Sequence, residues 1–234
     1  MQPPFLSTWS PAQGHYSVQA QTTDAAGLAN TSDPTRVDVI GSGGSLAVGT
    51  VAMPTSGPTD LTSEGTADWI LFGGGPSDLV GQPGSSVVRK AGVGQLISNA
   101  KVLGDEVAYG AQNYNAQFAF EDGTPNPQGT SVQGGLIIFN GAIVNNGFEI
   151  TVKADTVPRT LRLYVGAAYG GGGKLKAYLS DGGAPVYVDT SLQATANAFS
   201  VCTVYVIKFS AASAGQTLTV RLTMDSVTRL SGGN

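Results

Sequence analysis

The hydrophobic pattern of this chain is a succession of short runs in which apolar and polar residues alternate. The clearest run spans residues 174–180, where Leu175, Ala177 and Leu179 alternate with lysine, tyrosine and serine. A period of two is typical of β-strands that bury one face. Roughly ten such runs follow one another at intervals of about 8–12 residues, without a helical period. The pattern predicts an all-β fold, an antiparallel β-sandwich of the jelly-roll type.

The N-terminal part of the pattern predicts a β-hairpin. Residues 15–22 and 35–40 read as strands, and a turn is expected at residues 24–27, DAAG. An isolated hairpin is only marginally stable in water. We therefore expect this segment to dock on the following domain, with the remnant of a truncated domain as the alternative.

A glycine- and serine-rich joint divides the chain into two expected units. Residues 41–45, GSGGS, have the composition of a flexible linker. Residues 1–40 before it form the hairpin segment, and residues 46–231 after it carry the sandwich pattern. The sequence thus predicts a short N-terminal segment, a linker and one large β domain.

Glycine and asparagine clusters predict two hairpins inside the large domain. The strands at 159–166 and 174–180 are expected to pair across the glycines at 170–173. Asn145, Asn146 and Gly147 form a strong turn signal ahead of a strand at 148–152. These turns set the strand pairings that we expect.

Composition narrows the class of protein. Charged residues make up 12% of the chain and the formal net charge is −4, with lysine and arginine scattered along the sequence. This distribution gives no electrostatic footprint for a nucleic acid or an anionic membrane. No apolar run approaches the roughly 18 residues that span a bilayer. We expect neither nucleic-acid binding nor membrane insertion.

The single cysteine and the N-terminus indicate where the protein works. Cys202 is the only cysteine, so no intramolecular disulfide or cysteine-based zinc cluster is possible, and its apolar neighbours predict a small core residue. A low charge content with many glycines, serines and threonines is typical of extracellular β proteins. No leader with a basic end and an apolar region is visible. We expect a secreted protein and a chain that is one piece of a longer parent with other domains.

The N-terminal hairpin resembles the last strands of bacterial immunoglobulin-like domains. Those domains carry a motif of tryptophan, glycine-tyrosine, alternating alanines and an aspartate-glycine turn. The residues of this chain that match it are Trp9, Gly14, Tyr16, Ala20, Asp24 and Gly27. The resemblance implies that residues 1–40 are a partial immunoglobulin-like segment.

The larger domain resembles a β-sandwich module of secreted bacterial multidomain proteins, of the carbohydrate-binding, galactose-binding-like type. The matching pieces are DLTSEGTADWILFG, RKAGVGQLISN, FEDGTP, PRTLRLYVG, GKLKAYLSDGGAP and ASAGQTLTVRL. Related copies have W-(V/A)-H-W-G where this chain has residues 69–73, WILFG. The resemblance implies an accessory module that binds a glycan.

Aromatic residues beside amides and carboxylates predict sugar contacts, because a pyranose ring stacks on an aromatic face while polar groups bond its hydroxyls. Trp69 is one candidate; a core role is its alternative, because residues 69–72, WILF, are apolar enough to be buried on both faces. The remaining predicted ligand-binding residues are Tyr109, Asn113, Tyr114 and Tyr169.

Carboxylates near Trp69 predict a second kind of site. Calcium takes six to eight oxygen ligands, and sandwich modules often hold one such ion in a structural role. The carboxylates that could supply these oxygens are Asp60, Glu64, Asp68, Glu121 and Asp122. A structural calcium ion is the only cofactor that we expect.

No catalytic motif is present in the sequence, and no catalytic residue is predicted. His15 is the sole histidine and no G-x-S-x-G sequence occurs. A carboxylate pair for glycoside hydrolysis, Glu64 with Glu121 or Glu149, stays open. The favoured function is non-catalytic binding of a glycan or extracellular polysaccharide as part of a larger secreted protein. The alternatives are a secreted glycoside or ester hydrolase and a structural spacer or adhesin domain.

Overall fold

The computed structural model confirms the predicted all-β fold, an antiparallel β-sandwich. It describes residues 9, 14–39, 43–73, 87–104, 108–110, 116–138, 143–167, 170–195 and 201–227. Within these residues one short helix, α1 (Leu61–Glu64), interrupts a succession of strands. No helix among the described residues has the length and apolar character needed to cross a membrane.

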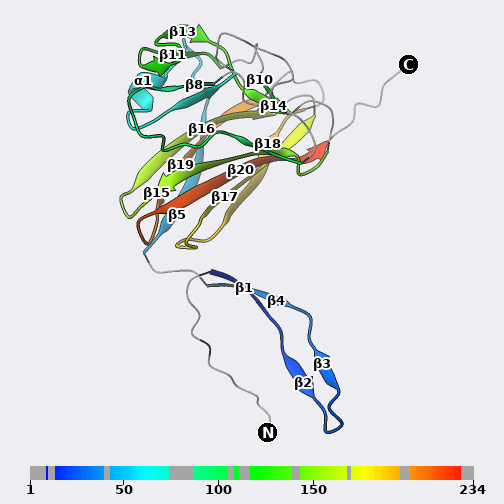
Figure 1. The fold of residues 1–234 in the computed structure, drawn as a ribbon. Helices are drawn as coiled ribbons and strands as arrows, with labels where there is room; N and C mark the ends of the chain where they lie inside the picture. The colour runs from blue at the N-terminus through cyan, green and yellow to red at the C-terminus, as the bar shows by residue number, and fades with distance from the viewer. Residues whose placement is uncertain are drawn as a thin grey trace, which may run out of the picture.

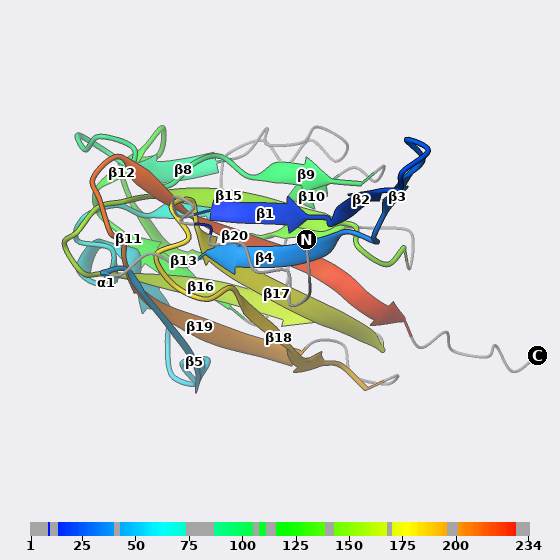
Figure 2. The same cartoon turned by 90° about the horizontal axis from the view of Figure 1, so that it is seen from below.

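Two sheets form the sandwich. The larger has five strands in the spatial order β18-β17-β20-β15-β9, and the smaller has three in the order β16-β19-β5. Figure 2 shows β9, β15, β20 and β17 following one another across one layer. The strands are β5 (Ser45–Ala52), β9 (Lys101–Leu103), β15 (Gly147–Ala154), β16 (Arg159–Ala167), β17 (Gly171–Leu179), β18 (Tyr187–Gln193), β19 (Val201–Ser210) and β20 (Gln216–Val227).

Alternating residues of the two sheets meet in the main core. From β17, Leu175, Ala177 and Leu179 are buried there, as the alternation in the sequence predicts. From β19, Tyr205 and Ile207 face them and are fully buried. Burial of such a side chain contributes about 1.5–3 kcal/mol, so this core holds the two sheets together.

A second, smaller core covers one end of the sandwich. It consists of Leu61, Trp69, Leu71, Val88, Phe118 and Phe120. The elements that build this end are β6 (Thr59–Asp60), α1, β7 (Ile70–Phe72), β8 (Val87–Lys90), β10 (Ala108–Gly110), β11 (Phe118–Phe120), β12 (Gly123–Thr124), β13 (Gly129–Val132) and β14 (Leu136–Ile138). Figure 1 shows α1, β8, β10, β11, β13 and β14 at the end of the sandwich away from β1 and β4.

Strand β7 joins the two cores. Trp69 and Leu71 lie in the small core, while Ile70 and Phe72 pack against the main core. Successive strand residues point to opposite faces, so both faces of β7 are covered. The prediction that residues 69–72 are buried on both faces is confirmed.

Both hairpins predicted inside the domain are wrong, because their strands pair with other strands than expected. β16 pairs with β19, whereas β17 pairs with β18 and β20 in the other sheet. Asn145 does form a turn, with φ 75°, but β15 then pairs with β9 and β20. Alternation shows that a strand buries one face; it does not show which of two sheets facing the same core the strand joins.

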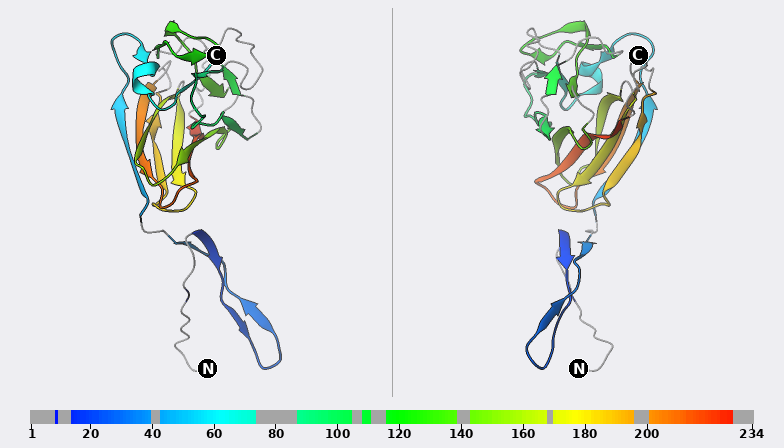
Figure 3. Two further views of the ribbon diagram at one scale, coloured as in Figure 1. Left: turned by 60° about the vertical axis from the view of Figure 1, so that its left-hand side comes forward. Right: turned by 90° about the vertical axis from the view of Figure 1, so that its right-hand side faces the viewer.

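The N-terminal segment is a two-part ribbon. β1 (Gly14–Val18) pairs with β4 (Thr35–Val39), and β2 (Gln21–Thr23) pairs with β3 (Ala29–Thr31). The predicted strand 15–22 is thus two strands, joined to the returning strands through the predicted turn, where Gly27 has φ 81°. Figures 1 and 3 show the ribbon extending away from the sandwich. The expected docking is not observed.

Candidate functional site

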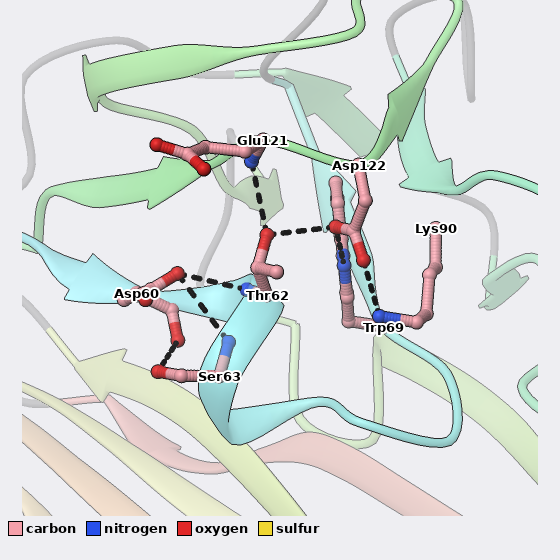
Figure 4. A network of polar contacts seen from close by, with 7 residues as sticks. All are labelled: Asp60, Thr62, Ser63, Trp69, Lys90, Glu121 and Asp122. Carbon is pink, nitrogen blue, oxygen red and sulfur yellow. Dashed lines mark hydrogen bonds and ion pairs between the residues drawn. The ribbon is translucent and has the colours of Figure 1, made fainter.

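A network of polar groups surrounds Asp122 in the small core. Its Oδ1 atom accepts hydrogen bonds from Trp69 Nε1 at 2.9 Å and from Thr62 Oγ1 at 2.8 Å. Its Oδ2 atom forms an ion pair with Lys90 Nζ. Thr62 Oγ1 in turn accepts a hydrogen bond from the backbone N–H of Glu121 at 2.9 Å. Figure 4 shows these groups pointing at one another from α1, the residue before β7, β8 and the turn after β11.

The donors around Asp122 control its charge. Partial burial acts to raise the pKa of this carboxyl, but the hydrogen bonds from Lys90, Thr62 and Trp69 outweigh burial and hold the pKa below its ordinary value. The Lys90 side chain is only 10% exposed, so the pair needs both charges present. The arrangement ties three elements to one carboxylate.

The predicted calcium ligands have protein partners at this end of the sandwich. Asp60 caps α1, accepting hydrogen bonds from the backbone N–H groups of Thr62 and Ser63. Asp68 accepts two backbone N–H groups, those of residues 96 and 97, at 2.8 and 2.9 Å. Glu64 accepts from the Tyr164 hydroxyl at 2.6 Å.

These five carboxylates do not converge. Glu121 is exposed and Asp122 is held by its three donors. Among the residues that the structure describes, no group of three or more histidine, cysteine, aspartate or glutamate side chains is placed to hold a metal ion. The calcium site stays a prediction.

Trp69 occupies the position of a core residue. Only 3% of its surface is exposed, and its ring lies 5.0 Å from that of Phe120. Its indole N–H is used by Asp122. A sugar ring therefore cannot stack on Trp69. The residue occupies the core position that we gave as the alternative to ligand binding.

The other predicted sugar contacts lie at or beyond the limits of the described residues. Tyr109 is in β10, with its backbone opposite Ile137 of β14. Asn113, Tyr114 and Tyr169 lie outside the described residues. Ligand binding by these four residues stays a prediction.

Of the two open carboxylate pairs, Glu64 with Glu149 is separated, and Glu64 with Glu121 stays a prediction. Glu64 bonds to Tyr164, which points outward from the three-stranded sheet into the small core. Glu149 pairs with Arg221 on the outer side of the five-stranded sheet. Because the two glutamates lie on opposite outer faces of the sandwich, they cannot act on one glycosidic bond.

A different surface emerges on the outer face of the five-stranded sheet. Since Leu175, Ala177, Leu218 and Val220 point into the main core, their neighbours along β17 and β20 point outward. Across the strands, one row on this face runs through Lys101, Glu149, Arg221 and Lys176, and the next runs through Thr151, Thr219 and Tyr178. The strands hold these side chains in fixed register.

Tyr178 is the aromatic residue that the described strands place on this outer face. Its ring lies 5.4 Å from Lys176 Nζ and 5.9 Å from Arg221 Cζ, measured to the ring centroid. Arg221 Nε is 2.5 Å from Glu149 Oε2. A partly exposed ring among charged and hydroxyl groups can stack on a sugar and bond its hydroxyls.

Sequence reasoning missed Tyr178. It follows Lys174 and Lys176 in the alternating run at residues 174–180, from which we predicted only a strand that buries one face. The signal was the strand period itself: it puts Tyr178 on the same outward face as both lysines. Its neighbours from β15 and β20 lie about 30 to 45 residues away in sequence and become visible only through strand pairing.

Comparisons with models of protein families, with curated proteins and with solved structures found no match to this chain. The resemblance to secreted bacterial modules therefore stays a prediction, and function has to be argued from the surfaces described above.

Proposed function

We propose that this protein binds a glycan without chemically altering it, and that the outer face of the five-stranded sheet is the binding surface. The observation that carries the proposal is the position of Tyr178, a partly exposed ring on a strand with a paired neighbour on each side. A rigid strand presents a ring at low entropic cost. As part of a larger secreted protein, the domain would keep that protein bound to its polysaccharide.

The groups around Tyr178 fit a polyhydroxylated ligand. Arg221 and Lys176 donate hydrogen bonds, Glu149 accepts them, and Thr151 can do both. Their spacing follows the distance of about 4.8 Å between paired strands. A chain of sugars lying across the strands would meet a new set of polar groups at each strand.

A pull-down against soluble and insoluble polysaccharides tests the proposal. We expect binding to at least one glycan, without release of sugar into the supernatant. Tyr178→Ala should weaken that binding about two- to tenfold, because aromatic contacts contribute about 0.5–1.5 kcal/mol, and Tyr178→Phe should retain most of it. Tyr16→Ala, in the N-terminal ribbon, is the matched control.

Three outcomes would count against this function. Released sugar would indicate a hydrolase, and the absence of binding to every glycan would favour a structural spacer. Binding that survives Tyr178→Ala but is lost in a Tyr109→Ala/Tyr114→Ala variant would move the surface to the predicted loop site. The assay is run with calcium and with chelator, which tests the predicted calcium ion directly.

A further inference from the structure

The outer face of the five-stranded sheet gathers positive charge in a protein whose net charge is −4. The described strands of this sheet contain five lysine and arginine residues, and all five lie on the outer face. Among the described strands only two carboxylates share that face, Glu149 and Asp225, because Asp189 points inward to the hydroxyl of Tyr205. The described strands thus carry an excess of three positive charges on this face. The five cations are Lys101, Lys153, Lys174, Lys176 and Arg221.

The two carboxylates do not neutralise this face. Arg221 pairs with Glu149 at 2.5 Å, and Lys174 lies 3.7 Å from Asp225. Lys153 and Lys176 form no ion pair with any carboxylate among the described residues. These two ammonium groups are available to an anion from outside.

Two of the cations are held directly against each other. Arg221 and Lys176 are partners in the register of β20 and β17, and like charges directly opposite one another destabilise a sheet. Both lie beside the ring of Tyr178. A bound anion at this point would relieve the repulsion while its carrier contacts the ring.

We propose that the glycan bound by this face is a polyuronate, a polysaccharide with one carboxylate on each sugar. This inference rests on the proposed function and specifies its ligand. A carboxylate suits the guanidinium of Arg221 and the ammonium of Lys176, and the sugar ring suits Tyr178. An excess of three charges matches one charge per sugar better than the several per sugar of a heavily sulfated chain.

Titration with polygalacturonate and with its methyl ester tests whether binding depends on the carboxylates of the glycan. Esterification removes the carboxylate charge and keeps the sugar. We expect the acid form to bind at least tenfold more tightly, and its binding to weaken as salt is added. Lys153→Gln/Lys176→Gln should weaken binding about three- to tenfold. The control Arg162→Gln/Lys208→Gln removes the same charge from the opposite sheet, where both side chains are exposed, and should leave binding unchanged.

The outcomes separate this inference from the proposed function. Equal binding of the ester and the acid, lost in Tyr178→Ala, would overturn the polyuronate and leave glycan binding intact. Equal loss in both double variants would overturn the assignment to this face. Tighter binding of heparin or of a single-stranded DNA would overturn the ligand class, and failure to bind any glycan would overturn both proposals.

Discussion

Two regions of this molecule contain the same kinds of side chain in different roles. At the small core, Trp69, Lys90 and Asp122 form a closed set in which the polar groups meet one another. On the outer face of the five-stranded sheet, Tyr178 lies beside Arg221 and Lys176, and the positive charges exceed the negative ones. The two regions differ in whether their charged groups have partners: those of the small core do, whereas some of those on the outer face have none among the described residues.

This difference separates a structural network from a candidate binding surface. A buried polar group stabilises a fold when its partners are present, and is costly when one is removed. A part-exposed group without a partner adds little to stability and remains available to a ligand. The proximity of aromatic and charged residues in a sequence, as at residues 60–72, therefore does not by itself mark a site.

The largest effect is expected in the small core. Trp69→Ala removes a ring that is 3% exposed and leaves a cavity beside Phe120, so the free energy of unfolding should fall by about 3–5 kcal/mol. Tyr178→Ala should change it by less than about 1 kcal/mol. Urea unfolding measures both, and an equal loss in the two variants would remove the distinction between the regions.

A smaller loss of stability is expected from Asp122→Ala. It leaves Lys90, Thr62 and the indole N–H of Trp69 without their acceptor, which should cost about 2 kcal/mol. Glu149→Ala is the matched substitution on the outer face, where Arg221 is 40% exposed and can be solvated. Its cost should be clearly smaller in the same urea experiment; a greater cost would show that the outer face is also a structural network.

The pH dependence of stability sharpens the comparison further. The folded-state pKa of Asp122 lies below its unfolded value, so its carboxylate stabilises the fold above the unfolded pKa, near pH 4, and this contribution is lost as the pH falls through the folded pKa. Asp122→Asn should be less stable than the wild type at neutral pH, and the gap should narrow by about pH 2. A gap that stays constant with pH would contradict the charge-based account.

How much of the fold could be predicted depends on how far apart in the sequence the interacting residues lie. The alternation of Leu175, Ala177 and Leu179 is local, and it correctly predicted a strand with one buried face. The two-sided burial of residues 69–72 was predicted for the same reason. Which sheet β16 and β17 join depends on pairing with β19 and β20, which lie about 40 residues or more further along the chain, and no local pattern encodes it.

The candidate sites show the same limit. Lysine and arginine are scattered in the sequence, and we took that scatter to give no electrostatic footprint for a nucleic acid or an anionic membrane. Strand pairing nevertheless brings five of them to one face. The helix α1 was missed because it is four residues long and depends on the cap supplied by Asp60. That cap is a single residue within a chain otherwise dominated by strand signals.

The most direct test of this account is one titration series with a bound glycan, carried out on the wild type, Tyr178→Ala and Thr62→Val. Thr62→Val is nearly isosteric and removes the hydroxyl that links Asp122 to the backbone of Glu121, so it should reduce stability by about 1 kcal/mol and leave the dissociation constant unchanged. Tyr178→Ala should do the reverse, weakening binding about two- to tenfold with little change in stability. If Thr62→Val weakens binding while Tyr178→Ala does not, the ligand surface is at the small core and the roles assigned to the two regions are wrong.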